Sequence, residues 1–185
     1  MRCLPAVARE VGADERTLRR AVERGGIRCR RPGPRRLELA EGELDYLRTH
    51  WGLMRALTGV LRTEPNVRLA VLYGSMARGE DRRDSDVDVL VELNPDASEA
   101  ARGLAVRLER ALGRDVDVAR LDRARESAPL LVLQALEEGR VLVDRDECWR
   151  SLMRERDRIE NSAISAHEAS REQAAIAFDE LMEQI

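Results

Sequence analysis

The segment between residues 67 and 93 limits the possible folds of this chain more than any other. An apolar run from Val67 to Tyr73 ends at a Gly-Ser pair, and a second apolar run follows from Val87 to Leu93. Short apolar runs rich in β-branched residues and bounded by Gly, Pro or Asn are typical of buried strands. The segment therefore predicts two strands joined through a Gly-Ser turn and a short helix.

Strands and helices continue to alternate after the second run. The pattern predicts helices over 98–112 and 129–138, and strands over 115–119 and 141–143. With 43% hydrophobic residues and a net charge of only −3, the composition is not that of a disordered protein. Alternating elements of this kind are typical of a sheet with helices packed on it. We therefore expect an α/β (α+β) core over residues 66–145.

Three acidic residues are candidates for metal binding in this core. Asp86 and Asp88 stand two residues apart at the start of a strand, so both carboxylates point to the same face. Carboxylates placed this way repel each other unless a cation lies between them, and Mg²⁺ held by one or two carboxylates plus substrate phosphates is the usual arrangement. Asp115 and Asp117 begin a later strand, and we favour Asp117 because it lies deeper, between Val116 and Val118. A third carboxylate is suited to bridging a second metal and to deprotonating an attacking hydroxyl.

The turn that precedes the acids has the features of a phosphate site. Gly74 allows a phosphate to approach the backbone closely, and Ser75 offers a hydroxyl and an N–H where a helix begins. Arg78 follows the turn, and two roles remain open for it. It either pairs with a phosphate or with Asp86, or forms a structural ion pair.

The assembled motif is Gly-Ser-Met-Ala-Arg-Gly, then Ser-Asp-Val-Asp after five residues, then a further Asp on a later strand. It resembles the polymerase-β-like nucleotidyltransferase superfamily, and within it the minimal, MNT-type branch, many of whose members are antitoxins paired with HEPN ribonucleases. The resemblance covers about residues 66–145. It implies that Gly74 and Ser75 contact the triphosphate of an NTP and that Asp86, Asp88 and Asp117 bind Mg²⁺. The implied products are a nucleotidylated target and pyrophosphate, and the implied reaction is transfer of AMP from ATP to a partner protein such as a HEPN-type toxin.

Residues 1–40 lie outside this resemblance and are basic. Residues 1–39 hold eleven arginines against five acids. The pattern predicts two short helices about Gly12, the second capped by Asp14 and ended by Gly25, and then a basic hairpin around Pro32. This arrangement resembles a winged helix-turn-helix that binds DNA, although a small docking module with an arginine-rich surface fits the same pattern. The candidate DNA contacts are Arg16, Arg19, Arg20 and Arg35.

Two further segments complete the predicted organisation. Residues 41–65 have helical spacing with one apolar stripe, and we expect a connecting helix there that ends before Pro65. Residues 146–185 predict one long helix or two, which pack on the core or mediate assembly, so a homo-oligomer is a further possibility. Neither a signal sequence nor an apolar run long enough for a bilayer is present, and the expected location is the cytoplasm, without a membrane partner.

Two other functions compete with transfer to a protein. The same chemistry directed at a small molecule would give an aminoglycoside-like adenylyltransferase, for which the segment 146–185 is a thin acceptor domain. A non-enzymatic reading is a DNA-binding transcriptional regulator that uses the nucleotidyltransferase fold as a sensor or dimerisation body. The three acids argue against it, since folding does not require them to cluster.

Overall fold

A four-stranded sheet forms the centre of the protein, in the order β6-β5-β4-β7. The computed structural model describes residues 2–33, 36–95, 97 and 100–182. Strand β4 pairs antiparallel with β5 and with β7, whereas β5 and β6 pair in parallel. The elements of this part are β4 (Val67–Tyr73), α4 (Gly74–Arg78), β5 (Val87–Leu93), α5 (Ala100–Leu112), β6 (Val116–Arg120), α6 (Leu121–Ser127), α7 (Pro129–Glu138) and β7 (Arg140–Asp144).

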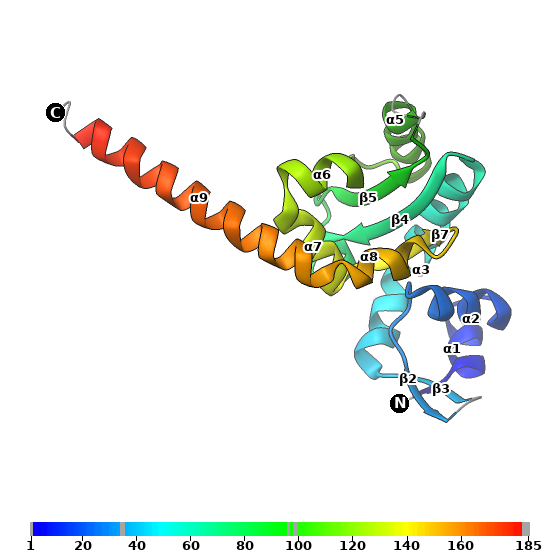
Figure 1. The fold of residues 1–185 in the computed structure, drawn as a ribbon. Helices are drawn as coiled ribbons and strands as arrows, with labels where there is room; N and C mark the ends of the chain where they lie inside the picture. Colours follow the sequence, from blue (N-terminus) through cyan, green and yellow to red (C-terminus); the bar gives the residue numbers. More distant parts are fainter. Residues whose placement is uncertain (1, 34–35, 96, 98–99, 183–185) are drawn as a thin grey trace.

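Alternate residues of the strands are buried on opposite faces of this sheet. On one face, Val87, Val89 and Val91 of β5 join a cluster that includes residues of α5 and of the long helix α3 (Glu41–Thr63). On the other face, Leu90 of β5 joins a cluster that includes α6 and α7. Helices therefore cover both faces, which confirms the predicted α/β class (Figure 1).

The N-terminal elements form a second, smaller unit beside the sheet (Figure 1). They are β1 (Arg2–Cys3), α1 (Leu4–Glu10), α2 (Glu15–Arg24), β2 (Arg30–Gly33) and β3 (Arg36–Leu39), and the three strands pair in the order β1-β3-β2. The Asp14 carboxylate accepts hydrogen bonds from the backbone N–H groups of Arg16 and Thr17, at 2.8 and 3.2 Å, and Gly25 ends the helix with a φ of 92°. Both predicted ends of this helix are thus confirmed.

Several local predictions differ from the structure. A connection was expected at Pro32, but strand β2 continues through Pro32 to Gly33. This strand lies at the edge of its sheet, where a proline is tolerated although it has no N–H to donate. Strand β1 and helix α6 were not anticipated, since two residues are too few for a pattern and the polar segment Leu121–Ser127 lacks a continuous apolar face. The arrangement of helices and a small sheet does not test DNA binding, which stays a prediction.

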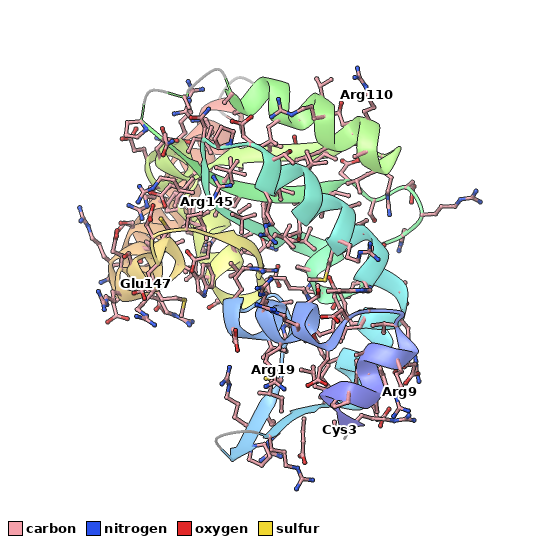
Figure 2. The ribbon with its side chains drawn as sticks, turned by 90° about the vertical axis from the view of Figure 1, so that its right-hand side faces the viewer. Cys3, Arg9, Arg19, Arg110, Arg145 and Glu147 are labelled. Carbon is pink, nitrogen blue, oxygen red and sulfur yellow. The ribbon has the colours of Figure 1, made fainter. Side chains whose placement is uncertain are left out.

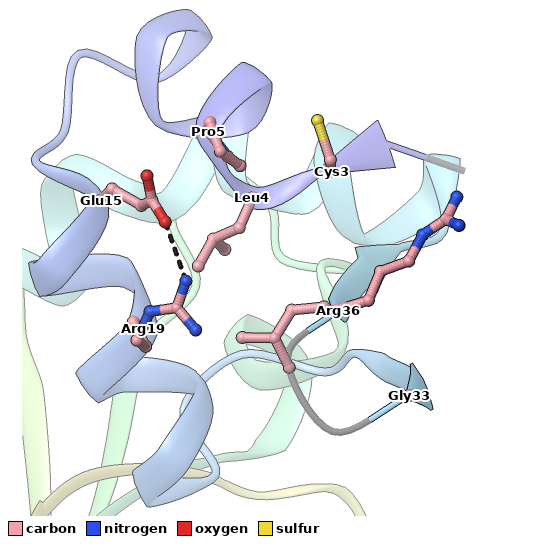
Figure 3. A pocket seen from close by; sticks show the side chains of 8 residues that line it. Cys3, Leu4, Pro5, Glu15, Arg19, Gly33 and Arg36 are labelled. Atoms are coloured by element: carbon pink, nitrogen blue, oxygen red, sulfur yellow. Dashed lines mark hydrogen bonds and ion pairs between the residues drawn. The ribbon is translucent and has the colours of Figure 1, made fainter.

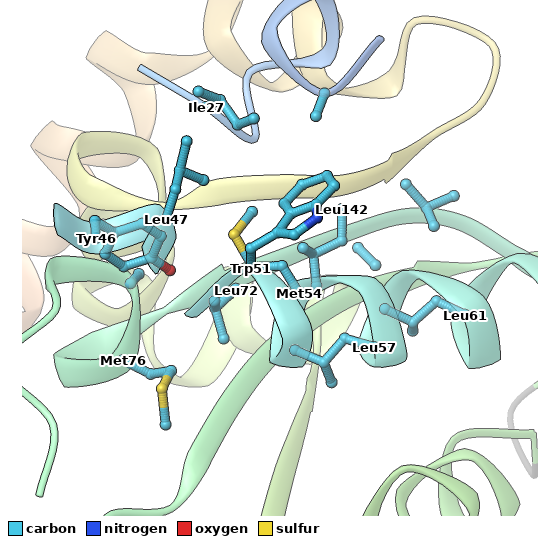
Figure 4. Packing of buried hydrophobic residues seen from close by; sticks show 14 of the residues in the cluster. Ile27, Tyr46, Leu47, Trp51, Met54, Leu57, Leu61, Leu72, Met76 and Leu142 are labelled. Atoms are coloured by element: carbon cyan, nitrogen blue, oxygen red, sulfur yellow. The ribbon is translucent and has the colours of Figure 1, made fainter. Parts of the chain in front are cut away.

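Helix α3 and the C-terminal helices complete the molecule. The apolar stripe of α3 is buried, with Trp51 and Met54 packed towards Ile27 of the N-terminal unit and Leu142 of β7 (Figure 4). The C-terminal segment forms α8 (Cys148–Arg154) and α9 (Arg156–Met182), and α9 packs on α7 before it projects from the body (Figure 1). Within the described ranges, no helix is both long and apolar enough to cross a membrane.

Candidate active site

The turn between β4 and α4 depends on a glycine. Gly74 has a φ of +73°, a conformation that side chains other than glycine rarely adopt. A Cβ atom at this position would lie 2.3 Å from Oδ2 of Asp88. The absence of a side chain at residue 74 therefore allows the Asp88 carboxylate to approach the backbone that opens α4.

The sheet register brings two of the predicted acids side by side. Asp88 of β5 is the register partner of Asp117 on the parallel strand β6, and of Tyr73 on the antiparallel strand β4. Asp86 lies two residues before Asp88, where the backbone N–H of Val87 donates to the carbonyl of Asp115 at 3.0 Å. Because the register pairs Asp88 directly with Asp117, it is Asp117 rather than Asp115 that lies beside Asp88.

The acids also influence one another electrostatically. Asp88 is half-buried, and its pKa is raised by burial first and then by the negative charges of Asp117 and Asp86, while Arg78 acts in the opposite direction. Burial and the charges of Asp88 and Asp117 raise the pKa of Tyr73 to about 12. The sequence did not predict Tyr73 as a neighbour of the acids. The feature that could have indicated it is its position as the last strand residue before the Gly-Ser pair.

The three carboxylates have the chemistry that a divalent cation requires. Among the described residues, no three acidic, histidine or cysteine side chains already converge closely enough to form a ligand set. Oxygen donors are nevertheless what Mg²⁺ prefers, and the mutual repulsion that raises the Asp88 pKa is what a cation between these groups would relieve. The backbone register places Asp88 beside Asp117, and Asp86 lies immediately before β5, two residues from Asp88.

The other two predicted nucleotide contacts differ in their surroundings. The Ser75 side chain is half-buried, and its hydroxyl makes no hydrogen bond with any residue that the structure describes, so it is available to a ligand. The Arg78 guanidinium instead donates to carboxylates of Glu80 and Glu138, each at 2.6 Å. Of the two roles left open by the sequence, the structure shows Arg78 in ion pairs within the protein.

Two residues missed by sequence reasoning hold the loop that leads to the acids. Nε2 of His50, in α3, lies 2.7 Å from Oδ1 of Asp81, and its Nδ1 lies 3.0 Å from the carbonyl oxygen of Tyr46. On the other side, Nη2 of Arg114 donates to the Ser85 carbonyl at 2.7 Å. No spacing in the sequence connects residue 50 to residue 81, because the contact exists only once α3 packs against the sheet.

Three of the four predicted DNA contacts lie on α2, in the N-terminal unit. Arg16 and Arg20 are exposed on α2, whereas Arg19 donates to the Glu15 carboxylate at 2.8 Å beside a pocket that also includes Arg36 (Figure 3). Arg35 lies outside the described residues. Two of the four arginines are thus available for an anionic partner on α2.

Gly74→Ala is expected to reduce nucleotidyl transfer by about 100-fold, since misplacement of a catalytic group by about 1 Å costs a factor of that order. The new methyl group would collide with the Asp88 carboxylate and would also strain a backbone with positive φ. Transfer rates of the variant and wild type measure the effect. Gly113→Ala is the matched control, because Gly113 also has a positive φ of +64° but no atom within 4 Å of its Cβ position. Equal losses in both variants would contradict this role for Gly74.

Comparison with known protein families identifies the part of the chain that contains this site. Residues 55–148 match the family model described as polymerase beta, nucleotidyltransferase. The matched range includes the Gly-Ser turn and the three acids. Comparison with curated protein sequences gives no significant match.

Solved structures give matches over most of the chain. A chain from a crystal structure of a toxin–antitoxin with AMP-PNP is 24% identical, with 70% of this chain and 98% of that chain covered and a TM-score of 0.48. A structure of a tri-AMPylated Shewanella oneidensis HEPN toxin in complex with an MNT antitoxin gives 23% identity, 72% and 99% coverage and a TM-score of 0.47. Because the family model spans half of the sequence and includes the turn, the paired strands and the acids, the chain belongs to the polymerase-β nucleotidyltransferase family.

Proposed function

We propose that this nucleotidyltransferase uses Mg²⁺ to transfer AMP from ATP to a hydroxyl group of a partner protein. The observation that carries the proposal is the register of Asp88 with Asp117, beside a turn whose glycine lies against the Asp88 carboxylate. This arrangement gathers a phosphate-binding turn and three acidic groups at one end of the sheet. Such a site is suited to positioning a triphosphate and to stabilising the charge of phosphoryl transfer.

The residues of the chain would divide the work as follows. The backbone at Gly74 and the free Ser75 hydroxyl would hold phosphate oxygens, because the start of a helix provides N–H groups without partners. The acceptor oxygen would form a bond to the α-phosphorus while the bond from that phosphorus to the bridging oxygen breaks and pyrophosphate leaves. Asp117, the exposed member of the pair, would take the proton of the acceptor hydroxyl.

Asp86, Asp88 and Asp117 are the residues that would hold Mg²⁺. The bound ion would neutralise phosphate charge and favour departure of pyrophosphate. The half-buried Asp88 would anchor the ion, since its carboxylate lies between the Gly-Ser turn and β6. Asp86 and Asp117 are more exposed and would complete the set from either side.

The choice of a protein acceptor comes from the resemblance of the motif to the MNT-type branch, many of whose members are paired with HEPN toxins. The C-terminal segment supports it. Helix α9 packs on α7 and then projects from the body, so it forms no separate folded domain for a small acceptor within the described residues (Figure 1).

The test is transfer from ATP labelled at the α-phosphate, in the presence of Mg²⁺, with a HEPN-type protein from the same cell as acceptor. We expect label on that protein, and none when its hydroxyl-bearing residues are replaced. An aminoglycoside and other small hydroxylated compounds serve as parallel acceptors. Label on a small molecule alone would establish the competing adenylyltransferase, and no transfer with any of the four NTPs would favour the regulator.

A further inference from the structure

A second concave site lies between the N-terminal unit and the sheet, and the proposed reaction does not use it. Two adjoining cavities, of about 200 and 620 Å³, share the side chains of Arg20 and Arg24 from α2 and of Arg62 from the end of α3. Asp144 of β7 lines the larger cavity and pairs with Leu69, near the start of β4. Gly74 follows the other end of β4, so this site is separate from the acids.

The lining of this site is strongly basic in a protein whose net charge is −3. Five arginines line the two cavities, against only two carboxylates, those of Glu23 and Asp144. Oδ1 of Asp144 already accepts the backbone N–H of Trp149 at 3.1 Å. Arg145 donates to backbone carbonyls at the end of α3, including that of Arg62 at 3.0 Å. Within the described ranges, the guanidinium groups of Arg20, Arg55 and Arg62 have no ion-pair or hydrogen-bond partner.

The surroundings of Arg24 also show that positive charge is concentrated here. The pKa of Arg24 is lowered, by burial first and then by the positive charge of Arg62, with only partial compensation from Asp144. Nε of Arg24 donates to the carbonyl of Val141 at 3.4 Å, and among the described residues no carboxylate pairs with this guanidinium. A bound anion would offset this concentrated charge.

We propose that this site binds a small, multiply charged phosphate anion, either free pyrophosphate or the phosphate chain of a nucleotide. Arginine guanidinium groups offer paired N–H donors that match phosphate oxygens. The arginines line a cavity formed by three elements, and two carboxylates lie in its larger part. Basic groups confined to such a cavity suit a compact anion better than a continuous nucleic-acid backbone. Because α2 belongs to the N-terminal unit and β7 to the sheet, the bound anion would hold these two parts together.

The test is isothermal titration of the full chain with inorganic pyrophosphate in buffer that contains EDTA, so that no divalent cation assembles at the acids. Arg62→Ala and Arg20→Ala are each expected to weaken binding at least tenfold, since each removes an unpartnered cation from the cavity. Arg110→Ala is the matched control, because Arg110 is an exposed arginine on α5, which lines neither cavity, and it lies apart from Arg19 of α2 (Figure 2). ATP titrated in the same way identifies the source: tighter binding than pyrophosphate assigns a nucleotide, and equal binding assigns the free anion.

Three results would overturn the proposal. The first is no pyrophosphate or ATP binding to the wild type in EDTA. The second is an equal loss of affinity in Arg110→Ala and Arg62→Ala, which would show only a general effect of charge. The third is binding of duplex DNA without binding of either small anion, which would assign these arginines to a nucleic-acid backbone. Thermal melting of each variant, with an unchanged Tm, verifies that the lost arginine and not the fold is responsible.

Discussion

Asp88→Asn is expected to reduce transfer of AMP by about 10³-fold or more. The substitution keeps the shape of the side chain but removes the half-buried charge that lies between the Gly-Ser turn and Asp117. Stabilisation of transition-state charge by a bound metal is worth several kcal/mol, and about 4 kcal/mol corresponds to this factor. Single-turnover transfer of α-phosphate label, with saturating ATP and Mg²⁺, measures the loss.

The neighbouring strand supplies the control for this prediction. Asp117→Asn should show a loss similar to that of Asp88→Asn, whereas Asp115→Asn should retain transfer, since the register pairs Asp88 with Asp117 and not with Asp115. Comparable losses in both β6 variants would contradict the assignment of Asp117.

The fold itself should survive the Asp88→Asn change. The pKa of Asp88 is raised in the folded protein, so ionisation is harder there than in the unfolded chain, and the charged carboxylate opposes folding as the pH rises above the unfolded pKa. Removing the charge should therefore leave the Tm in EDTA unchanged or higher. A lower Tm would indicate that lost activity reflects lost structure.

Glu43→Ala is expected to lower the free energy of unfolding by about 3–5 kcal/mol, the usual cost of removing one partner of a buried ion pair. Oε1 and Oε2 of Glu43 accept hydrogen bonds from Arg140 at 2.6 and 3.0 Å, and the two side chains are only 7% and 2% exposed. Without the carboxylate, a buried guanidinium would lose its counter-charge. For a chain of this length we expect the Tm to fall by about 10 °C or more, which thermal unfolding followed by circular dichroism measures.

Asp45→Ala is the matched control for this second prediction, because Asp45 lies two residues away on α3 and pairs with Arg48 at the surface. An exposed pair contributes about 1 kcal/mol or less, so the Tm should change little. A similar fall in both variants would show that the burial of the Glu43–Arg140 pair is unimportant.

The same ion pair joins the N-terminal unit to helix α4, which follows the Gly-Ser turn. Arg140 also donates to the carbonyl of Ala77 in α4 at 2.7 Å and lies 3.4 Å from the ring centroid of Tyr46. Glu43 in turn accepts the backbone N–H of Arg28 at 2.9 Å. Loss of Glu43 should thus loosen contacts on both sides of α3.

The sequence by itself determined the local elements and the chemical character of the site. Apolar runs of strand length, the helical stripe of α3 and the cap at Asp14 each depend on neighbours within a few residues, and they can be predicted from local pattern. The Gly-Ser turn and Asp86-Val87-Asp88 are also local, so alternation along one strand was enough to place both carboxylates on one face. The matched family model includes these same residues.

Only the tertiary structure decided which distant residues meet. The preference for Asp117 over Asp115 agrees with the pairing of β5 and β6, but that pairing depends on how the strands align and not on either strand alone. Three contacts join residues 31 to 97 positions apart: His50 with Asp81, Arg78 with Glu138, and the buried pair of Glu43 with Arg140. The pair of Arg78 with Glu80, in contrast, is local. The arginine pocket arises in the same way, because α2, α3 and β7 are separate in the chain and adjoin only through packing of their apolar faces.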